Sequence, residues 1–277
     1  QGSGADELAI SSTYQGLPVI DGVTQFLVGA RCLLAYRDFQ QRAVMKCDVA
    51  DQQKVDYWKR QLQDCDYVSE SLASELLRDF GIPMIQSLEV SSLDELQTAV
   101  LNVGFPLVLK TAVQGIDHKT EVGGVILNIS DQRQLQDAYE DLLQRLGPAV
   151  TVAPMADNNG VEMILGVSRD EQFGPTVVVG FGGIYAEILS DVAVMLPPFD
   201  SAEVKRVLKS LSMYPLLEGV RGGSPLDIDS YCDVAAKMSA IALALSDSVV
   251  EIDINPVRLG VKGCIGLDAL VVQEKKN

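Results

Sequence analysis

Residues 105–129, FPLVLKTAVQGIDHKTEVGGVILNI, decide how the middle of this chain folds. An apolar run closes at Lys110, a polar segment with His118 follows, and the pair Gly123 and Gly124 opens a second apolar run. Two short apolar runs separated by a polar segment predict two β-strands joined by a loop. His118 is the only histidine among the 277 residues, so its position in that loop is the first feature to explain.

The composition indicates a folded, acidic protein. A chain of 29.9 kDa with 47% hydrophobic residues can bury a substantial core, and its length predicts about two domains. The net charge of −16 argues against nucleic acid and against an anionic membrane as partners, because both are bound by clustered lysine and arginine. Any phosphate ligand must therefore meet local positive charge.

Cysteine usage and hydropathy predict a cytoplasmic protein that does not enter a membrane. The five cysteines are an odd number without a CxxC pair, which indicates reduced thiols and no zinc site. The apolar runs fall short of the roughly 18 to 20 residues that span a bilayer, and no secretory signal opens the sequence.

The apolar pattern predicts a short N-terminal part and two α+β modules. Residues 1–4 resemble a tag remnant, 16–20 a strand, 24–39 an amphipathic helix and 40–66 a polar linker. The first module spans 65–157, with helices 69–80, 93–103 and 132–146 and strands 84–90, 106–112, 123–129 and 149–155. The second module spans 158–277, with strands 161–167 and 175–181, helices 202–211 and 233–245, and a closing strand pair, 249–257 and 264–272.

Several common active-site motifs are absent from the sequence. No GxxxxGK[ST] occurs, and GFGGIYAE fails the GxGxxG spacing of a dinucleotide fold. No serine lies in GxSxG, which argues against a Ser-His-Asp hydrolase. A strand-end lysine, a glycine-rich loop and a polar hairpin are the candidates that are left.

The lysine and the glycine pair favour a phosphate ligand. Strand side chains alternate between faces, so Val108 and Lys110 share one side and the Lys110 ammonium is expected to meet solvent or a ligand. Gly123 and Gly124 would let the backbone lie close to a phosphate and offer it N–H donors. A plain exposed lysine beside a plain turn is the alternative.

The C-terminal strand pair predicts a metal site. Glu251, Asp253 and Asn255 alternate with isoleucines and therefore project from one face. If the turn is centred on 261–262, antiparallel pairing places Asn255 opposite Asp268, with Cβ atoms about 4.5 to 5.5 Å apart. Two oxygen ligands in this arrangement suit a nucleotide-bound Mg²⁺. A solvated polar face of an edge hairpin is the alternative.

These residues belong to motifs that carry a family resemblance over about residues 66–272. The motifs are LLRDFGIP, GFPLVLKTAVQGIDHKTEVGGV, GVEMILGVSRDEQFGPTVVVGFGGIYAEILSD, GVRGGSPLD, EIDINPV and GLDALVV. They resemble the ATP-grasp part of ADP-forming acyl-CoA synthetases, relatives of succinyl-CoA ligase. The resemblance implies an ATP-grasp fold, in which two α+β subdomains hold ATP or ADP between them.

The resemblance also implies roles for individual residues around a nucleotide. Lys110 would contact the phosphates and the loop of Gly123 and Gly124 would cover them. Ala153 to Met155 would be the hinge whose backbone meets adenine, and Glu162 would accept hydrogen bonds from the ribose hydroxyls.

Two further sets of residues follow from the same resemblance. Asn255 and Asp268 would hold Mg²⁺. Glu187 and Asp191 would lie near the site, without an assigned role.

For His118 the resemblance implies a catalytic role. In this family the reaction acyl-CoA + ADP + phosphate ⇌ acid + CoA + ATP proceeds through phosphohistidines, and His118 matches the histidine of the HKT motif. A neutral imidazole, with a pKa near 6.5, is a competent nucleophile near pH 7. An exposed loop histidine without a role is the alternative.

Two other classes of protein stay open at this stage. A nucleotide-binding regulatory domain, as in an acyl-CoA-synthetase-like protein lysine acetyltransferase, would keep Lys110 and Glu162 but need neither His118 nor Asn255. A purely structural subunit would leave the hairpin and the glycine loop without a role. The intact HKTEVGGV, RGG and DINP motifs favour the ligase.

The N-terminal part predicts a partner. Residues 16–39 resemble the last strand and helix of a flavodoxin-like CoA-ligase domain, and a single βα unit cannot bury its own apolar face. CoA-binding and CoA-ligase domains upstream in a longer chain are therefore expected partners. Whether the protein is a homo-oligomer stays open.

Overall fold

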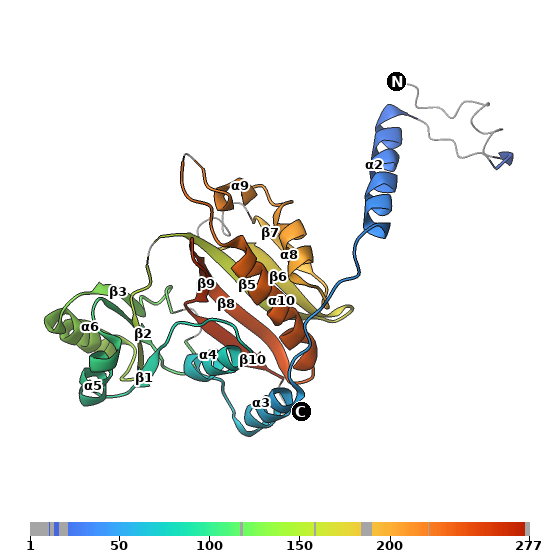
Figure 1. Ribbon diagram of the computed structural model, residues 1–277. Helices are drawn as coiled ribbons and strands as arrows, with labels where there is room; N and C mark the ends of the chain where they lie inside the picture. The colour runs from blue at the N-terminus through green and yellow to red at the C-terminus, as the bar shows by residue number, and fades with distance from the viewer. Residues whose placement is uncertain are drawn as a thin grey trace. The chain divides into compact units, whose positions relative to one another are not determined.

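The computed structural model describes residues 11, 14–16, 22–116, 119–157, 159–183, 190–220 and 222–274 (Figure 1). The chain divides into two compact units, Gln1–Val44 and Met45–Asn277. The first unit contains helix α2 (Val23–Gln40), as predicted, and none of its residues is buried. Of the strand predicted at 16–20, residues 17–20 lie outside the described residues. Among the helices of the described part, none combines the length and the apolar character that a bilayer crossing requires.

The second unit contains two antiparallel sheets, counted over the described residues. The four-stranded sheet has the order β1-β4-β2-β3 and is formed by β1 (Leu88–Val90), β2 (Leu107–Thr111), β3 (Val125–Ile129) and β4 (Val150–Pro154). The six-stranded sheet has the order β10-β8-β5-β6-β7, with β9 paired to β8. Its strands are β5 (Val161–Asp170), β6 (Gly174–Phe181), β7 (Val192–Met195), β8 (Val249–Leu259), β9 (Cys264–Gly266) and β10 (Ala269–Gln273).

Helices α5 (Leu93–Val103) and α6 (Gln132–Arg145) pack against the four-stranded sheet. The side chains of Ser92 and Asp131 accept hydrogen bonds from the backbone three residues later, which fixes where each helix begins. Apolar residues spaced three and four apart line the buried stripe of each helix, such as Leu135 and Leu142 in α6. This module confirms the predicted alternation of helices and strands.

Helices α10 (Ile228–Ala244) and α8 (Ser201–Leu208) share a hydrophobic core with the six-stranded sheet. Helix α10 packs on β5 and β6, and α8 lies against α10 (Figure 1). Met163, Leu165 and Val167 of β5 are buried in the core that these helices share with the sheet. Glu162 and Ser168 alternate with them on the opposite face, which leaves that face free for polar groups.

Helix α3 (Gln52–Asp64) contradicts the predicted linker at 40–66. Val55, Trp58 and Leu62 are buried in the core of the six-stranded sheet, and the Trp58 indole Nε1 donates to Asp79 Oδ2 at 2.9 Å. These three apolar residues form a single helical stripe in a very polar segment. The polar majority concealed that stripe, which is why the prediction was wrong.

Helix α4 (Glu70–Asp79) corrects the predicted module boundary. It begins at the capping residue Ser69, as expected, but Leu76 and Leu77 pack in the core of the six-stranded sheet and α4 contacts β10 (Figure 1). Met84 forms a bridge with Gly266, so the chain leaves that sheet only after this point. Residues 65–87 therefore pack with the second module, because the apolar stripe of α4 has its partner surface there.

Smaller differences concern strand lengths. The strand predicted at 84–90 is reduced to β1, and the strand predicted at 264–272 is interrupted between β9 and β10. Strand β7 and the short helix α9 (Tyr214–Leu217) were not predicted. The interruption between β9 and β10 falls at Leu267 and Asp268, inside the predicted metal hairpin.

The burial of α3 generates a stability prediction. Leu62→Ala should lower the free energy of unfolding by about 2 to 5 kcal/mol, because it opens a cavity in the core. Urea unfolding followed by the fluorescence of Trp58, the single tryptophan, measures this. Gln61→Ala, at an exposed position of the same helix, should change stability by less than about 0.5 kcal/mol. Equal effects of the two substitutions would mean that α3 is not part of the folded core.

Candidate functional site

The hairpin of β8, β9 and β10 has the predicted register. Pairing joins Leu259 to Cys264 and Ile254 to Ala269, and the Gly260 N–H donates to the Gly263 carbonyl across the turn. Asn255 therefore lies opposite Asp268, and the Asn255 backbone N–H donates to the Asp268 carbonyl at 3.3 Å. Both predictions, the turn centre and the pairing, are confirmed.

The polar face of this hairpin concentrates carboxylates. Ile252 and Ile254 are buried, whereas Glu251 and Asn255 are exposed, which confirms the predicted alternation. Burial raises the pKa of Asp253 to about 6, the charges of Glu251 and Asp268 add to the rise, and a hydrogen bond with the Asn255 side chain opposes it. A face with this much negative charge favours a bound cation.

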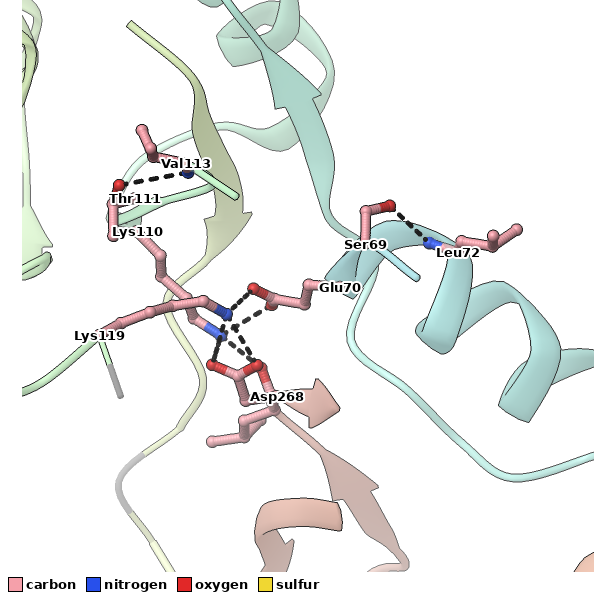
Figure 2. Close-up of polar contacts among 9 residues, drawn as sticks. Ser69, Glu70, Leu72, Lys110, Thr111, Val113, Lys119 and Asp268 are labelled. Atoms are coloured by element: carbon pink, nitrogen blue, oxygen red, sulfur yellow. Dashed lines mark hydrogen bonds and ion pairs between the residues drawn. The ribbon is translucent and has the colours of Figure 1, made fainter. Parts of the chain in front are cut away.

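Lys110 lies at the end of β2 and is buried, with 8% of its surface exposed. Its Nζ donates to Glu70 Oε1 at 3.0 Å, to the Leu267 carbonyl at 2.7 Å and to Asp268 Oδ2 at 2.9 Å (Figure 2). Of the two predicted surroundings, solvent or a ligand, solvent is wrong for this ammonium, and contact with a ligand stays a prediction. Glu70, at the start of α4, and Asp268, between β9 and β10, place two carboxylates beside this end of β2.

Lys119 joins the same group of charges from the segment after β2. Its Nζ donates to Glu70 Oε2 and, at 3.2 Å, to Asp268 Oδ1 (Figure 2). Burial of the ammonium acts to lower its pKa, but the Asp268 and Glu70 carboxylates outweigh burial and raise it. Lys119 therefore stays charged at neutral pH. His118, the residue before it, lies outside the described residues.

The four side chains of Glu70, Lys110, Lys119 and Asp268 are called the charge cluster below. Sequence reasoning missed Glu70 and Lys119. Lys119 was part of the HKT motif without an assigned role, and Glu70 followed a helix-capping serine, where an acidic residue is common for local reasons. No sequence signal places Glu70 beside two lysines that are 40 and 49 residues away.

The glycine pair forms a tight turn that closes against β2. The Gly124 N–H donates to the Lys119 carbonyl at 2.7 Å, and the Gly124 carbonyl accepts from the Thr111 N–H at 2.7 Å. A Cβ on Gly124 would lie 2.6 Å from Thr111 Cγ2, so only glycine fits. Gly123 has a φ of +64°, which also favours glycine. Covering a phosphate stays a prediction for both residues.

The predicted hinge lies at the end of β4. Ala153 pairs with Val108, and the Met155 N–H donates to the Pro106 carbonyl at 2.9 Å. That N–H is therefore already engaged within the four-stranded sheet. The adenine contact of this backbone stays a prediction.

Glu162 lies on the polar face of the six-stranded sheet, beside a cavity at the hinge. Its Oε1 accepts from Arg258 Nη2 at 2.8 Å, and Arg258 Nε is buried without a hydrogen-bond partner among the described residues. Arg258 also lines a cavity of about 650 Å³, together with Pro154, Ala156 and the turn between β8 and β9. This volume is within the range of small-molecule sites.

Asp191 holds a loop: it accepts hydrogen bonds from the backbone N–H groups of Ser212 and Met213, at 3.0 and 2.8 Å. That Asp191 lies near the nucleotide stays a prediction. Glu187 lies outside the described residues.

The donor set at the hairpin fits Mg²⁺ held mainly by substrate. Among the described residues, no group of three or more His, Cys, Asp or Glu is arranged around a common metal position. Asn255 and Asp268 offer two neighbouring oxygen donors, and Mg²⁺ commonly takes one or two protein oxygens plus water and substrate phosphates. The fit requires Asp268 to exchange its lysine partners for the ion.

Comparisons with known proteins identify the family. The model of the ATP-grasp domain family matches residues 61–272. The chain is 33% identical over 213 residues to the beta subunit of acetate–CoA ligase [ADP-forming] I of Pyrococcus furiosus, which covers 73% of this chain and 90% of the relative. It is 34% identical over 218 residues to trans-feruloyl-CoA synthase FCS1 of an unknown prokaryotic organism, covering 75% of this chain but only 31% of the relative.

A solved structure shares the fold. It is the acetyl-coenzyme A synthetase 1 of Ca. Korarchaeum cryptofilum in complex with coenzyme A and Mg-AMPPCP, described with its phosphohistidine segment pointing towards the nucleotide binding site. The TM-score is 0.68 at 30% identity, over 80% of this chain and all of the other. These three relatives are named as a ligase, a synthase and a synthetase, which does not favour the regulatory alternative.

The fit at Gly124 generates a prediction about this loop. Gly124→Ala should destabilise the protein by about 1 to 3 kcal/mol, because the new methyl group collides with Thr111 Cγ2. Adding Thr111→Ser removes that atom and should recover part of the loss, which thermal unfolding measures. Gly260→Ala is the control, because its φ, like that of Gly124, lies outside the left-handed region and its new Cβ would meet no atom closer than 3.7 Å. A double variant no more stable than Gly124→Ala would argue against the contact.

Proposed function

The chain belongs to the ATP-grasp domain family, as the ATP-grasp portion of an ADP-forming acyl-CoA synthetase, and on this basis we propose that it transfers a phosphoryl group between nucleotide and His118. The observation that carries the proposal is the charge cluster beside Asn255, where Lys110, Lys119 and Asp268 meet within hydrogen-bond distance. Ammonium groups bind phosphate oxygens, and the carboxylate and amide oxygens bind Mg²⁺.

The nucleotide would lie between the two sheets. Its phosphates would reach Lys110 and the loop of Gly123 and Gly124, and its ribose would reach Glu162. Support for this placement comes from the polar face of the six-stranded sheet, where Glu162 lies on β5, which pairs with β8, and Asp268 lies between β9 and β10, opposite Asn255 of β8. ATP or ADP is the expected nucleotide.

Asn255 and Asp268 would hold Mg²⁺. When bound, the ion supplies positive charge to the nucleotide phosphates and so stabilises charge that develops during transfer. The residues of the chain orient the phosphates around it. Lys110 and Lys119 would donate to phosphate oxygens once Asp268 has turned away from them.

His118 would receive the phosphoryl group. An imidazole nitrogen forms a bond to the γ-phosphorus of ATP while the bond from that phosphorus to the ADP oxygen breaks, and the reverse step makes ATP. The imidazole must be unprotonated to attack. The phosphohistidine segment named for the Korarchaeum structure supports this role for the matching HKT motif.

The acid substrate and CoA would be handled by other domains. The chain spans 31% of the feruloyl-CoA synthase and 90% of the acetate–CoA ligase beta subunit. Helix α2 leaves Phe26, Leu27, Leu33 and Leu34 more than half exposed, which supports a covering partner such as the CoA-ligase domain expected from the sequence. Acyl-CoA formation from acid, CoA and ATP by this chain alone would contradict this division of labour.

The phosphohistidine role generates the central prediction. Incubation with γ-labelled ATP and Mg²⁺ should give an acid-labile, base-stable label, and His118→Ala should abolish it because no other imidazole exists. Affinity for ADP, measured by calorimetry, should change by less than about threefold if the lysines and the glycine loop bind the phosphates. Gln114→Ala, an exposed position of the same segment, should label like the wild type. Undiminished labelling of His118→Ala would exclude the role.

The metal assignment generates a second prediction. Asp268→Asn should weaken ADP binding in the presence of Mg²⁺ by about 1 to 3 kcal/mol, because a formal charge beside the ion is lost. Without Mg²⁺ the affinity should be kept or rise, since two ammonium groups lose a competing carboxylate. Calorimetry with and without Mg²⁺ separates the two effects. Asp229→Asn makes the same charge change at an exposed site away from the cluster. A similar Mg²⁺ dependence in both variants would contradict the assignment.

A further inference from the structure

We propose that Glu70 is a positioning residue for phosphoryl transfer: it holds the ammonium groups of Lys110 and Lys119 side by side and keeps them there when Asp268 turns to the metal ion. The inference rests on the proposed function of this site. It adds a residue from α4, a helix that carries none of the predicted ligands.

The geometry gives each carboxylate of the charge cluster two lysine partners. Glu70 bonds Lys110 through Oε1, at 3.0 Å, and Lys119 through Oε2. Asp268 bonds Lys110 through Oδ2, at 2.9 Å, and Lys119 through Oδ1, at 3.2 Å. The four groups thus form a closed ring in which every charge has two opposite neighbours (Figure 2).

The two carboxylates differ in exposure, and this difference suggests different roles. The side chain of Glu70 is 7% exposed, the least of the four, whereas that of Asp268 is 27% exposed, the most. Asp268 also lies opposite Asn255 on the acidic face of the hairpin. Asp268 is therefore the carboxylate that can exchange partners, and Glu70 is the one that stays.

Counting charges shows what the exchange does. Two lysines and two carboxylates give a net charge of 2 − 2 = 0 in the cluster. Once Asp268 is committed to a metal ion, the lysines and Glu70 give 2 − 1 = +1, which favours phosphate. With Asp268 on the metal ion and without Glu70, the two ammonium groups would repel each other and no carboxylate of the cluster would hold them together.

The support of Glu70 is rigid. It is the first residue of α4, directly after the capping residue Ser69, whose Oγ accepts from the Leu72 N–H at 3.3 Å. About two turns further on, Leu76 and Leu77 anchor the helix in the core of the six-stranded sheet. Lys110, by contrast, belongs to the four-stranded sheet, so Glu70 fixes the lysine pair relative to the opposite sheet, where Asp268 lies.

The position of Lys119 links this support to the reacting residue. Lys119 directly follows His118 in the sequence, so fixing its side chain fixes one end of the segment that carries His118. A positioning role predicts that losing Glu70 slows transfer more than it weakens nucleotide binding.

The test compares Glu70→Gln with Asp79→Asn in the whole chain. Glu70→Gln keeps the shape but removes the charge, and the rate of acid-labile labelling from γ-labelled MgATP should fall by about tenfold or more. The dissociation constant for MgATP, from calorimetry, should stay the same or decrease, because a negative charge leaves the phosphate site. Asp79→Asn removes a carboxylate that is paired with Lys54 and Trp58 at the other end of α4, and should label at the wild-type rate.

Glu70→Asp distinguishes positioning from mere stability. It restores the charge on a shorter side chain, so it should recover part of the labelling rate. The order of the labelling rates of Glu70→Gln, Glu70→Asp and Asp79→Asn should differ from the order of their melting temperatures. Wild-type labelling by Glu70→Gln would overturn this inference alone. If all three variants lost labelling rate in proportion to their loss of stability, that result would also overturn it. A wild-type protein that takes no label would overturn the proposed function and this inference with it.

Discussion

The ion pairs of the charge cluster are the interaction on which the site depends. Glu70 from α4, Lys110 from β2, Lys119 from the following segment and Asp268 from the hairpin meet there, although Glu70 and Asp268 lie 40 and 158 residues from Lys110. Removing one partner of a buried ion pair leaves an uncompensated charge, which typically costs about 3 to 5 kcal/mol. Full pairing is therefore needed wherever these charges are kept away from water, and it ties the two sheets together.

The same pairing explains how a protein of net charge −16 can hold a polyanionic ligand. The hairpin face, with Glu251, Asp253 and Asp268, favours a cation and disfavours a bare phosphate. The lysines beside it are neutralised as long as both carboxylates engage them. Binding of the metal ion is thus expected to strengthen binding of the nucleotide, and the reverse, because the ion takes up the Asp268 carboxylate that competes with phosphate for the lysines.

The packing of the second unit supports this arrangement. Helices α3 and α4 share a core with the six-stranded sheet, and α4 brings Glu70 to the sheet edge at β10. The four-stranded sheet has its own core under α5 and α6, so it can present Lys110 as a separate element. Two cores with a polar junction between them suit a site that must admit a ligand, since the charges can re-pair without disrupting either core.

Local sequence patterns alone determined much of this protein. Alternation and turn chemistry fixed the register that places Asn255 opposite Asp268, and capping residues such as Ser69 and Asp131 fixed where helices begin, because these features depend on residues within a few positions of each other. Family motifs singled out Lys110 and the glycine loop. Only the tertiary structure decided that Lys110 is buried, that α4 packs with the second sheet, and that Glu70 meets both lysines. Those outcomes depend on which distant surfaces pack together, and neither hydrophobic periodicity nor residue spacing encodes the partner of a buried charge.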